Sequence, residues 1–145
     1  MSDENKIIFS KSAKEAIGVG LNDWKGKVRI DIRTFVPVIG EDGLTPTPKG
    51  ISLNVDKYPE LLKAVQELGE VMSNDKLVAQ IPKNEKEEVR VGVNTYKNIP
   101  LIYIRIFAKS KGGDEWTATR KGISIKVDLY PRLLEAVEQL GNAIN

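Results

Sequence analysis

Apolar and polar residues alternate in several short segments of this chain. Every second residue is apolar in residues 15–22 and 27–35, and the pattern returns 72 residues further on, beginning at 87–94. A period of two is typical of a β-strand with one packed and one exposed face. Shorter segments at 44–48 and 50–55 predict two more strands. Strands joined by turns in this order predict an antiparallel meander.

The spacing of apolar residues changes after the fourth predicted strand. From Tyr58 onward they recur every three or four positions, which predicts an amphipathic helix. Asp56 is the predicted N-cap, and Pro59 lies in the first turn, where no backbone N–H is needed. Gly69 is predicted to follow the helix end. The second copy has the matching residues Asp128, Tyr130, Pro131 and Gly141.

The chain is an internal duplication. Residues 49–69 and 121–141 share 14 of 21 amino acids, and the same offset runs upstream without a gap. A repeat of this size is a domain and not a solenoid unit. We therefore predict an α+β protein of two tandem ββββα units, residues 1–72 and 73–145. The mixed charges of residues 83–88 indicate a solvated linker into the second unit.

Composition narrows the classes of function. The 145 residues include no cysteine and no histidine. Disulfides and thiolate metal sites are therefore excluded, and the commonest general base and transition-metal ligand are missing. We predict no catalytic residue, no metal and no cofactor, and an enzyme built on carboxylates is the least favoured alternative. No apolar run is long enough to predict a membrane span, and we expect a cytoplasmic protein, in the nucleoid of a bacterium or the nucleus of a eukaryote.

Charge is nearly balanced over the whole chain, with a net value of +2. Residues 1–72 hold 10 Lys and Arg against 11 Asp and Glu, whereas residues 73–145 hold 12 against 9. Any electrostatic binding must therefore depend on where the cations lie and not on their sum.

Alternation also identifies the side chains on the uncovered face of each sheet. On the second strand these are Lys27, Arg29, Asp31, Arg33 and Phe35, and in the copy they are Leu101, Tyr103, Arg105 and Phe107. Cations can hold phosphates, and aromatic rings can stack on bases for ~1–3 kcal/mol each. This face is therefore predicted to bind single-stranded nucleic acid, with packing as the alternative interpretation of the two phenylalanines.

Several of these segments resemble one known family. The segments Trp24-Lys25-Gly26-Lys27-Val28, Asp31-Ile32-Arg33 and Pro48-Lys49-Gly50-Ile51-Ser52-Leu53 are similar to the positive-cofactor-four (transcriptional coactivator p15) single-stranded-DNA-binding domain. The second copy is a looser match, through Tyr96-Lys97, Ile104-Arg105 and Arg120-Lys121-Gly122-Ile123-Ser124. The resemblance covers about residues 15–69 and 87–141.

The resemblance implies curved sheets and a homodimer, so that here the two units would pair as an intramolecular pseudodimer. It implies binding of single-stranded DNA with little sequence preference, in transcription regulation, replication or repair. The binding positions that follow from alternation and resemblance together are Trp24, Lys25, Lys27, Arg29, Arg33, Phe35, Lys49, Tyr96, Lys97, Tyr103, Arg105, Phe107, Arg120 and Lys121.

The chain also departs from the family pattern. Val36 and Ala108 replace a favoured aromatic residue, Ile99 stands at the position of Lys27, and Pro48 stands at that of Arg120. These changes predict an asymmetric and weaker site. They favour, as the alternative function, a protein-interaction module with weak or no nucleic-acid binding. Because stacking and phosphate contacts suit both nucleic acids, RNA stays open as a ligand beside DNA, and further assembly of chains stays open as well.

Overall fold

The computed structural model describes residues 6–73 and 75–144, apart from the side chain of Trp24. The first unit contains β1 (Ile7–Ser10), β2 (Ala16–Trp24), β3 (Lys27–Pro37) and β4 (Leu44–Asn54), followed by helix α1 (Tyr58–Leu68). The second contains β5 (Lys76–Pro82), β6 (Glu87–Tyr96), β7 (Ile99–Lys109) and β8 (Trp116–Lys126), followed by helix α2 (Tyr130–Ile144). A short 3₁₀ turn leads into each helix. Each set of four strands forms an antiparallel meander in chain order.

The predicted fold class is confirmed, but the strands are not all those expected. The segments 44–48 and 50–55, predicted as two strands, form one strand, β4. The fourth strand of each sheet is instead β1 or β5, at the N-terminal edge. Residues 83–88 are not a linker, because they form the turn between β5 and β6 and the start of β6.

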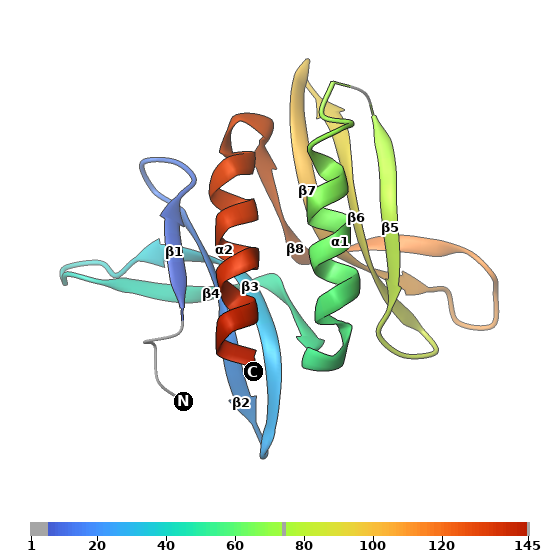
Figure 1. Cartoon of the computed structure of the whole chain (residues 1–145), viewed down its shortest axis with the longest axis horizontal. Helices are drawn as coiled ribbons and strands as arrows, with labels where there is room; N and C mark the ends of the chain where they lie inside the picture. The colour runs from blue at the N-terminus through green and yellow to red at the C-terminus, as the bar shows by residue number, and fades with distance from the viewer. Residues whose placement is uncertain (1–5, 74, 145) are drawn as a thin grey trace.

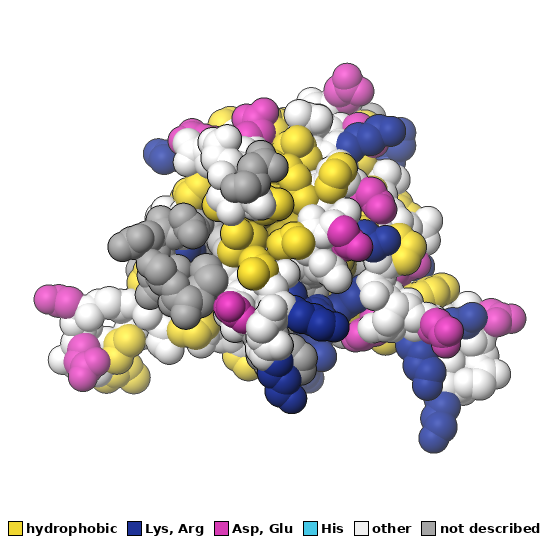
Figure 2. Space-filling model, turned by 60° about the horizontal axis from the view of Figure 1, so that its bottom comes forward, with side chains coloured by type: hydrophobic (Ala, Val, Ile, Leu, Met, Phe, Trp, Pro, Cys, Tyr) yellow, Lys and Arg dark blue, Asp and Glu magenta, His cyan; other side chains and the backbone are white. Residues whose placement is uncertain are grey.

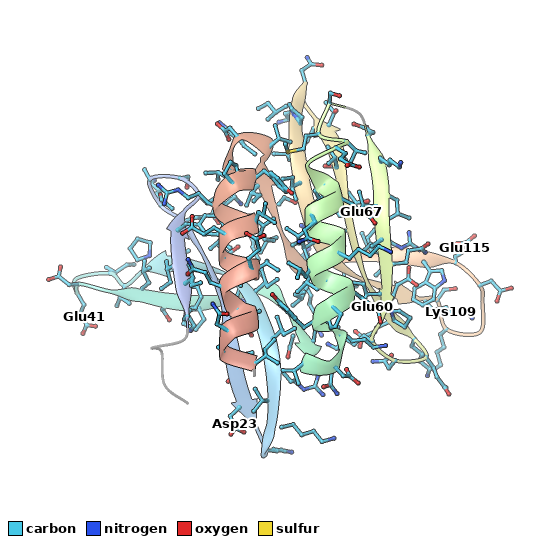
Figure 3. All side chains as sticks on the ribbon, in the orientation of Figure 1. Asp23, Glu41, Glu60, Glu67, Lys109 and Glu115 are labelled. Atoms are coloured by element: carbon cyan, nitrogen blue, oxygen red, sulfur yellow. The ribbon has the colours of Figure 1, made fainter. Side chains whose placement is uncertain are left out.

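A bulge explains why β4 stays continuous through its prolines. Arg33 pairs with Gly50 and Phe35 with Pro46, so β4 advances four residues while β3 advances two. The hydroxyl of Thr47 fills the gap and donates a 2.8 Å hydrogen bond to the carbonyl of Thr34. Such a bulge bends the strand. The β3–β4 and β7–β8 hairpins accordingly extend to opposite sides of the molecule (Figure 1), with Glu41 near one tip and Glu115 near the other (Figure 3).

The helices are exchanged between the two units. Helix α1 packs against β5 and β6 of the second sheet, and α2 packs against β1 and β2 of the first. Figure 1 shows α1 in front of the second sheet and α2 beside β1. The buried apolar residues of both units, including Leu61, Val65, Leu133 and Val137, form one continuous core. The sequence predicted one helix per sheet, and the structure shows that each sheet is covered by the helix of the other unit.

The helix ends differ from the predicted ones. Asp56 and Asp128 lie inside the 3₁₀ turns and are not N-caps of the helices, and Asn54 accepts the backbone N–H of Asp56 instead. Gly69 directly follows α1 as predicted, with an ordinary right-handed φ of −60°, whereas Gly141 lies within α2 and does not end it. The reason for glycine is close packing: a Cβ at Gly141 would lie 2.7 Å from the Tyr58 hydroxyl oxygen, and one at Gly69 would lie 3.0 Å from that of Tyr130.

Candidate nucleic-acid interface

The face of each sheet that points away from the helices carries the alternating side chains of the central strands. Arg29, Asp31 and Arg33 pair along β3 with Asn54, Ser52 and Gly50 of β4. Neighbouring residues on β3, such as Ile30 and Ile32, are fully buried in the core. Val28 lies on the core side by alternation with Lys27 and Arg29, but it is 43% exposed because it lies near the β2–β3 turn, at the end of the sheet.

An arginine lies across a glycine at the same place in both units. The Cβ atoms of Arg33 and Arg105 each lie 2.8 Å from where a Cβ would stand on Gly50 and Gly122, respectively. Arg33 Nη1 donates a 2.8 Å hydrogen bond to the carbonyl of Thr47, and Arg105 Nη1 donates one of 3.1 Å to that of Thr119. The glycine of each Lys-Gly-Ile-Ser segment, Gly50 or Gly122, therefore leaves the space that the arginine side chain occupies.

The two arginines differ in their charge partner. The Asp31 carboxylate accepts 3.1 Å hydrogen bonds from both Nε and Nη2 of Arg33. Tyr103 replaces that aspartate in the second unit, and Arg105 Nη2 donates instead to the Ser124 hydroxyl at 3.0 Å. No carboxylate among the described residues pairs with Arg105. Burial lowers the pKa of Arg105, although a guanidinium stays charged at neutral pH.

The three predicted aromatic residues of the open faces are in different environments. Phe35 is only 5% exposed, because its ring packs on Gly18 and is covered by the Lys6 ammonium, 4.6 Å from the ring centroid. It is a packing residue in this structure and not an open stacking platform. Phe107 is partly exposed under the guanidinium of Arg90, at 4.2 Å. Tyr103 is also partly exposed, and burial raises the pKa of its hydroxyl.

The two turns at the ends of the sheets carry the remaining predicted residues of that region. Tyr96 is 53% exposed, with the Lys97 ammonium 5.3 Å from its ring centroid. Lys25 and Lys27 are exposed at the equivalent turn of the first unit, where Lys25 has a left-handed φ of 51°. The side chain of Trp24 lies outside the described residues.

Two lysines that were not predicted complete the site across the boundary between the units. Lys83 lies beside a hollow of about 410 Å³ with Arg29 and Arg33 of the first unit. Lys11 lies beside a hollow of about 310 Å³ with Arg105 and Arg120 of the second unit and with Lys49. Each open face therefore receives a cation from the other unit.

Burial lowers the pKa of Lys83. The carboxylate of Glu87 works against this shift, while the cations of Arg29 and Lys121 add to it. Lys11 and Lys83 are 72 residues apart, so they are equivalent in the two repeats. A lysine kept at the same position of both copies was the signal that could have identified them.

Cations dominate part of the surface seen in Figure 2, where Lys and Arg side chains gather below an apolar area. Within residues 6–73 and 75–144, no three Asp or Glu side chains are grouped as ligands of a metal ion. No helix in the described part of the chain has the length and apolar character needed to cross a membrane. Phosphate pairing and base stacking are the chemistry that these faces offer.

Known proteins share this sequence pattern. The Transcriptional Coactivator p15 (PC4) family matches residues 11–64 and again residues 83–136. The RNA polymerase II transcriptional coactivator KIWI of Arabidopsis thaliana is 34% identical over 74 residues, which cover 50% of this chain. The match spans 66% of that protein, which is just under two thirds of its length.

Solved structures show weaker similarity. BPSL1147, a PC4 homolog from Burkholderia pseudomallei, has a TM-score of 0.40 at 22% identity, over 44% of this chain and 93% of its own. The bacteriophage T5 homolog of the eukaryotic transcription coactivator PC4, implicated in recombination-dependent DNA replication, has a TM-score of 0.36 at 23% identity, over 48% and 88%. The two family matches lie at the same 72-residue offset as the internal repeat. This chain therefore belongs to the Transcriptional Coactivator p15 (PC4) family and carries two copies of its domain in tandem.

Proposed function

We propose that this protein binds single-stranded DNA on its two open sheet faces, without catalysis. The observation that carries the proposal is the repeated arrangement of cations. Each face has an arginine seated on a glycine, and each receives a lysine from the other unit. Backbone phosphates of a flexible strand can reach both hollows, whereas a rigid duplex has less freedom to adapt to two separate faces.

Phosphate contacts and stacking make separate contributions to this binding. Neutralising phosphates releases counterions, so affinity falls as salt rises. Stacking on Tyr96, Tyr103 or Phe107 adds sequence-tolerant affinity, because every base has a π-face. The chain is therefore expected to bind exposed strands of transcription, replication or repair intermediates with little sequence preference.

The covalent link gives the two units a high effective concentration for each other. The reciprocal hydrogen bonds of Tyr58 with Val137 and of Tyr130 with Val65 support pairing within one chain. We propose that the protein in solution is an intramolecular pseudodimer, whose two faces can engage one strand.

The test is fluorescence anisotropy of a labelled oligothymidine of ~20 nucleotides at low and moderate salt, beside the matching duplex. We expect tight binding to the single strand, weakening with salt, and much poorer binding to the duplex. Lys83→Ala should weaken binding. Lys63→Ala, which removes the same charge from the exposed side of α1, is the matched control and should not.

A second function is favoured by the first face alone. There Arg33 is already paired with Asp31, and Phe35 is already covered. Because its arginine and its aromatic ring are already engaged, this face can instead contact a protein partner that does not need them. If the single strand does not bind at low salt, the protein-interaction alternative takes precedence, and a nuclease-resistant complex in native mass spectrometry would support it.

A further inference from the structure

The two open faces differ in chemical character at three equivalent positions. Along the exposed side of β3, the first face presents Lys27, Arg29 and Asp31, and along β7 the second face presents Ile99, Leu101 and Tyr103. These pairs are each 72 residues apart, so the difference is one of sequence and not of fold. Equivalent backbones thus carry two unlike surfaces.

The first face is mainly cationic. Lys27 is exposed, Arg29 is partly exposed, and Lys83 enters from the second unit beside Arg29. The one carboxylate on this stretch of β3, that of Asp31, is already held by Arg33. Arg29 and Lys83 therefore remain beside the hollow, Lys27 is exposed further along β3, and the ring of Phe35 is covered. This surface can attract phosphates but offers no open ring on β3 for a base.

The matching stretch of β7 on the second face is apolar and aromatic, whereas the cations of that face lie beside the hollow that Arg105 and Arg120 share with Lys11 and Lys49. Ile99 is 43% exposed, while Leu101 and Tyr103 are partly exposed. The Tyr103 side chain lies against Gly92, where its hydroxyl oxygen would be 2.5 Å from an added Cβ, so the sheet holds the ring in place. The cation of Arg90 is committed to Glu88 at 2.6 Å and to the ring of Phe107.

We propose that these two equivalent stretches bind different parts of a nucleic-acid strand, the Lys27–Asp31 stretch of the first face its phosphate backbone and the Ile99–Tyr103 stretch of the second face its bases. The proposal rests on the proposed function, because both faces must bind the strand. A held tyrosine beside exposed aliphatic side chains suits an unstacked base. A cluster of cations without an open ring suits phosphates, and its contribution depends on salt.

An abasic strand separates the two contributions. A sugar-phosphate oligomer with the same number of phosphates as the oligothymidine keeps the charge and lacks the bases. Tyr103→Ala should weaken oligothymidine binding about fivefold or more, the lower end of one base stack, and leave the abasic strand unaffected. Arg29→Leu gives the first face the residue of the second. It should weaken binding of both strands and flatten the salt slope by about 0.7, as for one lost phosphate contact.

The reciprocal change is the matched control. Leu101→Arg, which copies the first face, should strengthen binding of the abasic strand and steepen the salt slope. Tyr103→Phe, which keeps the ring, should recover the oligothymidine binding that Tyr103→Ala loses. Circular dichroism and thermal unfolding establish that each variant is folded. An equal proportional loss for both strands in Tyr103→Ala, or an unchanged salt slope in Arg29→Leu, would overturn the proposal. A wild type that binds neither strand would instead refute the proposed function itself.

Discussion

The hydroxyl of Tyr58, at the start of α1, donates a 2.7 Å hydrogen bond to the carbonyl of Val137 in α2. Tyr130 returns the same contact to Val65 at 2.8 Å. Because the two contacts are equivalent by the 72-residue repeat, the helix pair is joined as in an isologous dimer. These reciprocal contacts support the proposal that one chain contains both halves of a symmetric interface.

Removing this contact should destabilise the protein without affecting strand binding. Tyr58→Phe deletes the hydroxyl and keeps the ring, so we expect a loss of about 0.5–1.5 kcal/mol in the free energy of unfolding. Urea denaturation followed by circular dichroism measures it. Tyr130→Phe should cost a similar amount, and a loss in only one of the two variants would contradict the reciprocal arrangement.

A half-chain should not be a folded monomer. In a fragment of residues 1–72, β1 and β2 lose α2, and α1 loses the β5 and β6 surface that it covers. Exposed apolar surface of this kind is costly. We expect the fragment either to be unfolded or to dimerise by exchanging α1 between two copies, as measured by light scattering and circular dichroism. A cooperatively folding monomer would show that the exchange of helices is not required.

The strands and helices were predictable because their signals are local. A period of two identifies β2 and β3, and a period near 3.6 identifies α1, without knowledge of the rest of the chain. β1 was missed because four residues give too short an alternation, and β5 was missed because a bulge between Leu77 and Ala79 interrupts its pattern.

The exchange of helices was not predictable, since alternation shows which side of an element is apolar but not which surface covers it.

The candidate site was predicted only in part. Alternation placed Arg33 and Asp31 on one face, two residues apart, but the ion pair between them was not predicted and is a finding of the structure. The approach of Lys83 to Arg29 depends on packing between the units, which no local pattern shows.

The two equivalent arginines should have unequal effects on stability. Arg33→Ala leaves the Asp31 carboxylate unpaired at 8% exposure, which should lower the free energy of unfolding by about 1–3 kcal/mol. Arg105→Ala removes hydrogen bonds to the Thr119 carbonyl and the Ser124 hydroxyl but leaves no charged group without its partner. Its loss of stability should therefore be smaller. Thermal unfolding of the two variants compares them, with Asp31→Asn/Arg33→Ala as the control that should recover much of the loss. Equal costs would mean that the ion pair contributes little.

Lys83 links strand binding to pH. Burial, together with the cations of Arg29 and Lys121, lowers its pKa below the ordinary value of 10.5. The ammonium therefore begins to lose its proton at a lower pH than an exposed lysine does. A bound phosphate favours the protonated form, so binding must take up a proton wherever Lys83 is partly neutral.

Affinity for the oligothymidine should therefore fall as pH rises toward 10.5, before exposed lysines titrate. The salt slope should become shallower over the same range, by up to about 0.7 as one phosphate contact is lost. Lys83→Arg keeps the charge at every pH of the experiment, so its affinity should stay level until the other lysines lose their protons. Anisotropy titrations at matched ionic strength compare the two proteins. The same decline in wild type and Lys83→Arg would mean that another group is responsible and that Lys83 does not contact the strand.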